Sequence, residues 1–193
     1  MFNLDSHLLI GQGANRVVYH HPTEPYKCIK IPKDGGINAQ TLECDYYCKL
    51  KLHNTSWDHL SRYYGETETS LGRGYVYELI RDYDQAISHP LSYYLSTAPT
   101  KEITLDMLLK SLLELKEFLI NNKIIIRNLR PYNILYKRLN HREGLAVLID
   151  NIGHHNNRYH LSDHLSILAK RDIHKKWKKF ESSVQKSGIP ISI

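Results

Sequence analysis

Asp150 is a carboxylate in a position suited to binding a metal ion. It directly follows the apolar residues Val147, Leu148 and Ile149, so it lies at the end of a predicted strand, where a buried charge without a cation would be unfavourable. Hard cations such as Mg²⁺ take oxygen ligands of this kind. The alternative is that Asp150 caps a turn or a helix, a role that its neighbour Asn151 would also suit. We favour the metal-binding role.

The ammonium group of Lys30 is a second candidate for chemistry, because it follows two apolar residues in a predicted strand. A lysine that faces inward from a strand needs an anion, since an unpaired buried charge is costly. Glu43, thirteen residues further on in a predicted helix, is the best candidate for that anion. The alternative is a solvated lysine on an edge strand, and we favour the buried pair.

Gly11 and Gly13 lie in a tight polar turn between two predicted strands. Glycine lets backbone amides approach an anion closely, so this turn could lie over phosphate groups. Taken alone, the fragment is better interpreted as an ordinary hairpin that contains glycine.

The elements that must position these groups change character along the chain. The first half has the β-branched and aromatic runs of strands, and the second half has leucines at helical spacing. This is an α+β pattern. We predict strands at 8–10, 17–19, 26–31, 62–69 and 74–80, a helix at 38–52, a helix from 104, strands at 134–136 and 145–149, and a helix at 161–184.

The segment 126–135 resembles the catalytic loop of protein kinases, H-R-D-L-K-P-x-N-I-L. Two positions depart from that pattern, because Ile126 replaces the histidine and Asn128 replaces the catalytic aspartate. Seventeen residues after Asn133, the segment 148–153 resembles the apolar strand that leads into D-F-G, with its glycine one position later. The matching residues of the loop are Arg127, Leu129, Pro131, Asn133, Ile134 and Leu135.

Further motifs in the same order make the chain similar to the PhoP regulatory network protein YrbL family, a set of small bacterial kinase-like proteins. The resemblance runs over roughly residues 8–180. It implies an α+β, reduced bilobal protein-kinase-like fold, with a small antiparallel β-sheet N-lobe that holds one helix and a truncated helical C-lobe. We expect one kinase-like domain over 1–193, with the N-lobe at 1–82 and the C-lobe at 83–193. The motifs are Gly11-x-Gly13, 28–31, Glu43 with Tyr46-Tyr47, 62–65, 74–77, 131–135, 150–153 and 177–180.

The resemblance implies that ATP and Mg²⁺ bind in the cleft between the lobes. Lys30 would contact the α- and β-phosphates and pair with Glu43, while Asn133 and Asp150 would hold the magnesium. Arg16 stands where a third glycine is usual and could offer the nucleotide a charged contact. The full set of expected nucleotide contacts is Gly11, Gly13, Arg16, Lys30, Glu43, Tyr77, Glu78 and Ile80.

The amide of Asn128 cannot accept a proton from a substrate hydroxyl, which leaves three interpretations open. The chain is a catalytically inactive pseudokinase that acts as a regulatory or protein-binding module. Alternatively, it transfers phosphate slowly, since a general base is worth about 10²–10⁴-fold and positioning supplies much of the rest. In the third, another acid (Asp82, Asp84 or Asp163) replaces the base, or a different group, such as a nucleotidyl moiety, is transferred.

Arg130 stands where lysine is usual in the loop, and it could contact the γ-phosphate or an acidic group of the substrate. Lys30, Asn128 and Arg130 are therefore the candidate catalytic residues. No A-P-E motif follows Asp150, so we expect a reduced substrate-binding half, which argues against conventional Ser/Thr protein phosphorylation. The substrate would be an unidentified protein or small molecule.

Most of the net charge of +6 lies in one segment, since residues 170–179 contain six bases and one acid. A basic helix with Trp177 and Phe180 could meet nucleic acid, a membrane surface or an acidic protein. We favour a terminal helix that packs Ile173, Trp177 and Phe180 against the lobe and exposes its lysines.

Three features of the composition bear on location and metals. The odd number of cysteines, three, favours reduced thiols, and there is no apolar run long enough for a membrane span and no signal-peptide pattern at the N-terminus. We therefore expect a cytoplasmic protein. For His154, His155, His160 and His164 we favour a solvated histidine-rich loop over a zinc site.

Overall fold

The computed structural model describes residues 1–53, 55–97, 103–154 and 166–185. It divides into two compact units, the first formed by Met1–Asn54 with Ser61–Ile80 and the second by Thr55–Leu60 with Arg81–Ile193. The sequence places a single boundary after residue 82, whereas the structure places it after Ile80 and gives residues 55–60 to the second unit.

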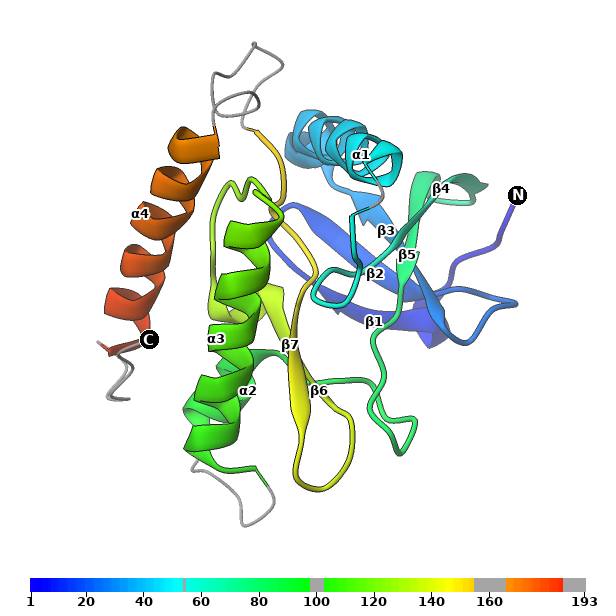
Figure 1. Cartoon of the computed structure of the whole chain (residues 1–193). Coiled ribbons are helices and arrows are strands. Elements are labelled where there is room, and N and C mark those ends of the chain that lie inside the picture. Colours follow the sequence, from blue (N-terminus) through cyan, green and yellow to red (C-terminus); the bar gives the residue numbers. More distant parts are fainter. Residues whose placement is uncertain (54, 98–102, 155–165, 186–193) are drawn as a thin grey trace. The chain divides into compact units, whose positions relative to one another are not determined.

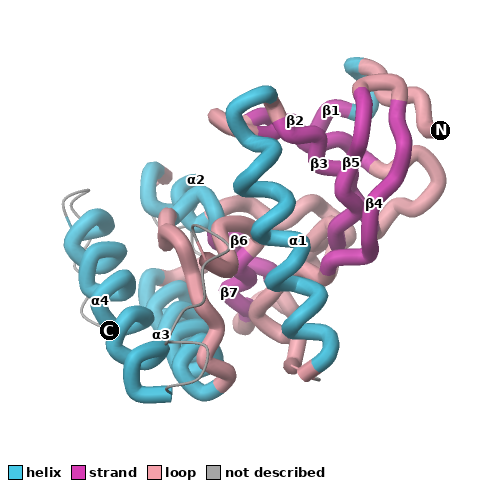
Figure 2. Tube along the Cα trace, turned by 90° about the horizontal axis from the view of Figure 1, so that it is seen from above, coloured by secondary structure: helices cyan, strands magenta, loops and turns pink. Residues whose placement is uncertain are grey.

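The first unit is built on a five-stranded antiparallel sheet with the order β1-β2-β3-β5-β4 (Figures 1 and 2). Its strands and helices are η1 (Ser6–Leu8), β1 (Leu9–Gln12), β2 (Arg16–His20), β3 (Lys27–Pro32), η2 (Asp34–Gly36), α1 (Ile37–Leu52), β4 (Tyr63–Thr69) and β5 (Gly72–Glu78). The tight β4–β5 turn needs a glycine, because Gly72 has a φ of +96°. Leu4, Ile29, Ile31 and Val76 form a core on the sheet.

Helix α1 buries a mixed face that includes Gln40, Glu43, Cys44, Tyr47 and Leu50. These positions recur every three or four residues, so they lie along one side of the helix. The ring of Tyr47 lies 5.5 Å from that of Tyr77 on β5, within the range of favourable aromatic contacts. The buried face of α1 therefore carries a carboxylate into the interior of this unit.

The second unit consists of helices around a two-stranded sheet. Its elements are α2 (Leu91–Ser96), α3 (Leu105–Asn121), η3 (Pro131–Asn133), β6 (Ile134–Arg138), β7 (Gly144–Leu148) and α4 (Ser166–Gln185). The hydroxyl of Thr104 caps α3 by accepting a hydrogen bond from the amide of Met107. Helix α3, whose leucines are mostly buried, lies beside β7 and α4 (Figure 1). Helix α2 is absent from the elements predicted from sequence, because six residues are too few to show a periodic pattern.

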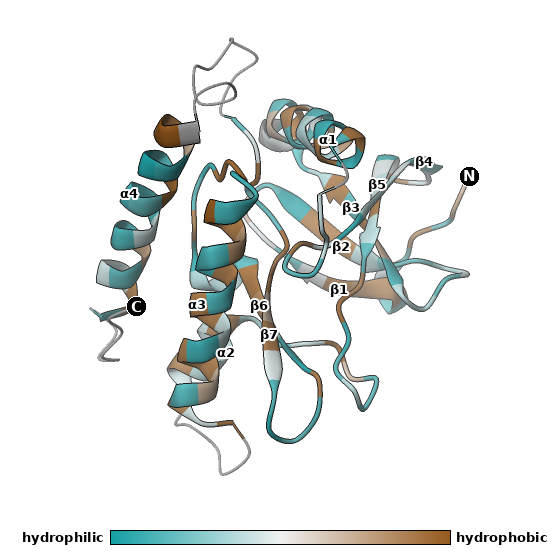
Figure 3. Ribbon diagram, in the orientation of Figure 1, coloured by the Kyte–Doolittle hydropathy of each residue, from teal (hydrophilic) through white to brown (hydrophobic). Residues whose placement is uncertain are grey.

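Helix α4 has a buried apolar side and a polar side that is coloured hydrophilic along most of its length in Figure 3. Ile173, Trp177 and Phe180 are each at most 1% exposed. The prediction that these three side chains pack into the protein while the lysines face outward is confirmed.

The α+β class is confirmed, with an antiparallel sheet, one helix inserted after β3, and a mainly helical second unit. A lysine on the third strand and a glutamate in the helix that follows are also features of the smaller lobe of protein kinases. The fold is thus a reduced protein-kinase-like fold. None of the helices within the described ranges has the length and apolar character needed to traverse a lipid bilayer.

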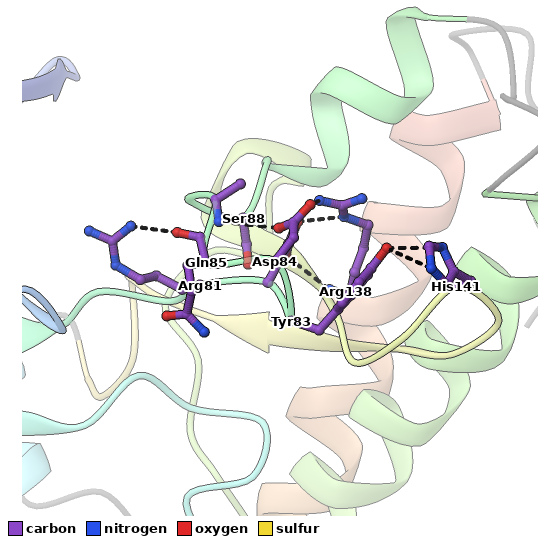
Figure 4. A network of polar contacts seen from close by, with 9 residues as sticks. Arg81, Tyr83, Asp84, Gln85, Ser88, Arg138 and His141 are labelled. Carbon is purple, nitrogen blue, oxygen red and sulfur yellow. Dashed lines mark hydrogen bonds and ion pairs between the residues drawn. The ribbon is translucent and has the colours of Figure 1, made fainter.

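The loop 81–88 is held to β6 by the buried carboxylate of Asp82. Its Oδ1 accepts hydrogen bonds from the Ser88 hydroxyl at 2.5 Å and the Arg138 amide at 2.9 Å, and its Oδ2 accepts from Arg138 Nε at 2.6 Å. Arg138 also pairs with Asp84, while Tyr83 contacts His141 (Figure 4). Asp82 is only 3% exposed, so its charge depends on these donors.

We expect Asp82→Asn to destabilise the second unit by about 2–4 kcal/mol, because the amide keeps the shape but loses the charge opposite a half-buried guanidinium. Hydrogen exchange should show faster exchange at the amides of Asp82 and Tyr83, which bond to Ala86 and Arg138. Asp84→Asn is the matched control. Its side chain is 40% exposed, so its loss should cost far less than the loss of the buried Asp82 carboxylate. Equal effects of the two changes would contradict the central role of Asp82.

Candidate functional site

Lys30 lies on β3, the central strand of the first unit, and is only 5% exposed. Its Nζ sits 4.0 Å from the centroid of the Tyr77 ring on the neighbouring strand β5. An ammonium over an aromatic face is attracted to the ring's quadrupole. The alternative of a solvated lysine on an edge strand is therefore wrong.

Glu43 is fully buried on α1 and forms a bidentate ion pair with Arg16 at the start of β2. The two bonds run from Arg16 Nη1 to Oε1 at 3.1 Å and from Nη2 to Oε2 at 3.2 Å. The Tyr77 hydroxyl donates to Glu43 Oε1 at 3.4 Å and accepts from Gln40 Nε2 at 2.8 Å. Burial, followed by the charge of Glu43, raises the pKa of Tyr77 well above its usual range. Tyr77 thus joins Lys30 and Glu43 in one polar cluster.

The Arg16–Glu43 pair bears on two expectations. Lys30 is the expected cation for Glu43; the structure gives Glu43 a bidentate pair with Arg16, and the pairing of Lys30 with Glu43 stays a prediction. Arg16 was expected to reach toward phosphates, but it is 7% exposed and its guanidinium points to α1. No local sequence pattern signals this pair, because the two residues are 27 positions apart.

The glycine turn between β1 and β2 closes on itself through the backbone. The amide of Gly13 donates to the carbonyl of Arg16 at 2.8 Å, and Lys33 Nζ donates to the carbonyl of Gly13 at 2.8 Å. A Cβ on Gly11 would meet nothing within 4 Å, and one on Gly13 would meet only the Arg16 carbonyl at 4.0 Å. Packing within the protein therefore does not require either glycine, which is compatible with a role toward a ligand.

The segment expected to receive adenine lies at the end of β5. Tyr77 and Ile80 are buried, and the amides of Glu78 and Leu79 already donate to the carbonyls of Arg62 and Tyr26, both at 2.9 Å. The Glu78 carboxylate accepts from the Arg62 amide at 3.2 Å. The backbone amide of Glu78, one of the groups predicted to contact adenine, therefore already donates a hydrogen bond within the protein.

In the second unit, a short backbone ladder brings the loop 125–133 against the segment 149–153. The amide of Arg127 donates to Asn151 at 2.7 Å, that of Gly153 to Ile125 at 2.8 Å, and that of Ile149 to Asn133 at 2.9 Å. Asn151 and Gly153 have φ values of 64° and 88°, which turn the chain sharply after Asp150. The ladder therefore brings the backbone of Asn133 against Ile149, the residue before Asp150, and the metal-binding role of Asn133 and Asp150 stays a prediction.

The side chains of this pair suit a hard cation. Asn133 is 6% exposed, and within the described ranges its side-chain Nδ2, a donor suited to a phosphate oxygen and not to a cation, has no hydrogen-bond partner. Asp150 is half-buried, and its Oδ1 accepts from the amide of Asn151 at 2.5 Å, so it does cap the turn. An amide oxygen and a carboxylate are oxygen donors that Mg²⁺ accepts, with phosphate and water supplying the rest.

Asn128 and Arg130 are exposed, while Leu129 between them is buried. Ile126, which replaces the usual histidine, is fully buried, and an apolar side chain suits that position. Residues 127–130 line a pocket of about 400 Å³ together with Asp172, Lys175, Lys176 and Lys179 of α4. The charge run of α4 is visible in the sequence, but its position beside this loop is not.

The structure describes two of the three acids that could replace the missing catalytic aspartate, Asp82 and Asp84. Asp82 and Asp84 both pair with Arg138, and hydrogen bonds from the Ala86 amide and from Arg138 lower the pKa of Asp84. Neither is suited to accept a proton from a substrate. Asp163 lies outside the described residues.

The histidine-rich loop also lies mostly beyond the described residues, which include His154 but not His155, His160 or His164. Within the described part of the chain, no cluster of three or more His, Cys, Asp or Glu side chains could hold a metal ion.

Comparison with known proteins gives a family and relatives. The family model described as PhoP regulatory network protein YrbL matches residues 2–185. The chain is 35% identical over 156 residues to "Uncharacterized protein YrbL" of Escherichia coli (strain K12), covering 79% of this chain and 74% of that protein, and equally so to the Shigella flexneri protein of that name. The Mycobacterium tuberculosis PknI kinase domain aligns with a TM-score of 0.45 and 10% identity, over 74% of this chain and 56% of that domain.

Since the family model spans nearly the whole sequence and the relatives share over a third of the aligned positions, the chain belongs to the PhoP regulatory network protein YrbL family.

Proposed function

We propose that this protein binds ATP together with Mg²⁺, as a kinase-like protein. The proposal is supported by the backbone hydrogen bond that brings Asn133 against Ile149, the residue before Asp150, and by a buried side-chain Nδ2 of Asn133 without a partner within the described ranges. A buried donor without an acceptor is costly, and an oxygen of a bound phosphate would compensate for it.

Lys30 supplies the second argument. It is a buried cation on the central strand, in the same polar cluster as Glu43. In protein kinases a lysine on the third strand contacts the α- and β-phosphates and pairs with a helix glutamate. Asn133 and Asp150 would hold the magnesium, and Mg²⁺, when bound, would neutralise charge on the phosphates.

A catalytically inactive pseudokinase that acts as a regulatory or protein-binding module is the second candidate. It is favoured by Asn128, whose amide has no basicity, and by the commitment of Asp82 and Asp84 to Arg138. The bidentate Arg16–Glu43 pair points the same way, because both carboxylate oxygens of Glu43 already have a cation. Both the kinase-like protein and the pseudokinase would use the nucleotide site, and only the first would turn over ATP.

Saturating ATP with Mg²⁺ should raise the melting temperature of the protein by roughly 5–10 °C, the shift expected for ligand at about a hundred times its dissociation constant. Asp150→Asn should abolish the magnesium-dependent part of this shift, since it removes the charge. The amide oxygen can still accept the hydrogen bond from Asn151, so the turn is kept. Thermal shift with ATP, ATP–Mg²⁺ and Mg²⁺ alone measures this.

ATP could also bind through its phosphates to the lysines of α4, outside the nucleotide site. The double variant Lys175→Ala/Lys179→Ala controls for this, and it should keep the magnesium-dependent shift in melting temperature. An absent shift in the wild type, or an identical shift in Asp150→Asn, would remove the nucleotide proposal.

Asn128→Asp should raise ATP turnover by about 10²-fold or more over a low wild-type rate, because it restores a proton acceptor at the usual position of the loop. Phosphate release under single-turnover conditions is the measurement, with Asn128→Ala as the control for loss of the amide alone. Wild-type turnover that Asn128→Asp does not increase would mean that another group accepts the proton. Absence of turnover in both proteins would favour the pseudokinase.

Arg16→Met should lower the free energy of unfolding by about 3–5 kcal/mol, because it leaves the buried carboxylate of Glu43 without its bidentate partner. Glu43→Gln in the same background should recover part of the loss, since the buried charge is then gone. Urea denaturation of the two single variants and the double variant tests this coupling. If the losses in free energy of unfolding of the two single variants simply add in the double variant, Arg16 and Glu43 are not each other's main partner.

A further inference from the structure

The basic side of helix α4 is fixed in place by its apolar side. Trp177 and Phe180 are buried, so Lys175 and Lys179, one helical turn apart, must lie on another side of the helix. Lys176 anchors the helix to the catalytic-loop-like segment, because its Nζ donates to the carbonyl of Ile126 and pairs with Asp172 at 2.6 Å. The basic side of α4 is therefore held beside residues 127–130.

These residues enclose a pocket of about 400 Å³, within the size range of small-ligand sites. Its wall carries five bases and one acid, namely Arg127, Arg130, Lys175, Lys176, Lys179 and Asp172. Asp172 is already paired with Lys176. Within the described ranges, Arg130, Lys175 and Lys179 form no ion pair with a carboxylate.

A second hollow of about 450 Å³ shares Arg130 and Lys179 with the first and adds Lys178, Ser182 and Ser183. Like charges gathered in this way repel one another, and a bound anion would relieve the repulsion. The excess of positive charge favours a dianion over a singly charged group. Arginine and lysine are the side chains that hold phosphate, the first by its planar fork and the second as a compact charge.

We propose that the pocket between α4 and residues 127–130 is a binding site for the phosphate group of a phosphomonoester. Such a group carries about −1.5 to −2 charges near neutral pH, which matches the unpaired bases. Arg130, Lys175 and Lys179 bind its oxygens, and the exposed amide of Asn128 at the rim can donate to it. The ligand is a free phosphate ester or a phosphorylated side chain of a peptide.

Nucleic acid fits this surface less well. Base stacking on aromatic side chains supports binding to single strands, but Trp177 and Phe180 are each 1% exposed. The cations of the pocket converge from a loop and a helix rather than following a stripe. The pocket shares Asn128 and Arg130 with the candidate catalytic residues, but its lysines, Lys175 and Lys179, are not among the predicted contacts of ATP or magnesium.

The test is calorimetric titration of the full chain with inorganic phosphate, pyrophosphate, a phosphoserine peptide and its unphosphorylated counterpart, without nucleotide or Mg²⁺ and at about 0.15 M salt. Lys175→Ala/Lys179→Ala should weaken binding of the phosphorylated probes by at least about tenfold. Lys170→Ala/Arg171→Ala is the matched control. It removes the same charge from exposed positions of the same helix outside the pocket and should leave binding within about twofold of the wild type.

Preference for the phosphopeptide over free phosphate and pyrophosphate would identify a protein-borne ligand, and the reverse would identify a small molecule; both support the site. Absence of binding in the wild type, or equal losses in the two double variants, would overturn it. So would binding of a single-stranded oligonucleotide that is tighter than any phosphorylated probe and equally weakened by both double variants. Because Asp150→Asn should bind phosphate normally, failure here is separable from failure of the nucleotide proposal.

Discussion

The second unit depends on the short backbone ladder between residues 125–127 and 151–153. Its hydrogen bonds from Arg127 to Asn151 and from Gly153 to Ile125 fix the loop, and the carbonyl of Ile126, left on the outer side, accepts from Lys176 of α4. One strip of backbone thus sets three things at once: the approach of Asn133 to Asp150, the exposure of Asn128, and the position of the lysines. A change that broke the ladder would disturb both the proposed metal site and the proposed anion pocket, whereas a side-chain change could affect either alone.

The first unit is governed by the cost of burying charge. Glu43 has no contact with solvent and is held by Arg16, Tyr77 and its helix. Lys30, close to the same tyrosine, is buried as well. Removing either partner of a buried pair costs far more than the pair contributes, so these residues constrain one another. Arg16 occupies the place of a glycine in the phosphate-binding turn of kinases, and its side chain serves the interior instead of a ligand. The turn consequently has one fewer glycine, and the Arg16 guanidinium that follows it pairs with the carboxylate of Glu43 on α1.

Most of the elements could be predicted from the sequence, and the contacts between distant side chains could not. The helical spacing of its leucines identifies α3, and a run without internal glycine or proline identifies α1, whereas α2 spans too few residues to show a pattern. The approach of Asn133 to Asp150 was accessible through resemblance to a known loop. The pair of Arg16 and Glu43 was not, since any of several cations could have met that carboxylate. The acids Asp82 and Asp84 looked like candidates for a base because a sequence shows a carboxylate and hides the arginine that binds it.

The departures of the loop from the kinase pattern are linked by charge. An aspartate at position 128 would add a negative group to a pocket that contains Arg130, Lys175 and Lys179, and it would oppose binding of a phosphate dianion there. Asparagine keeps the size and the hydrogen-bonding capacity and removes that repulsion. Ile126 fills a buried apolar position where a histidine would need a polar partner, and its own carbonyl accepts a hydrogen bond from Lys176 of α4. Under both proposals, an asparagine at position 128 and the cations of α4 would make this loop better suited to holding an anion than to accepting a proton.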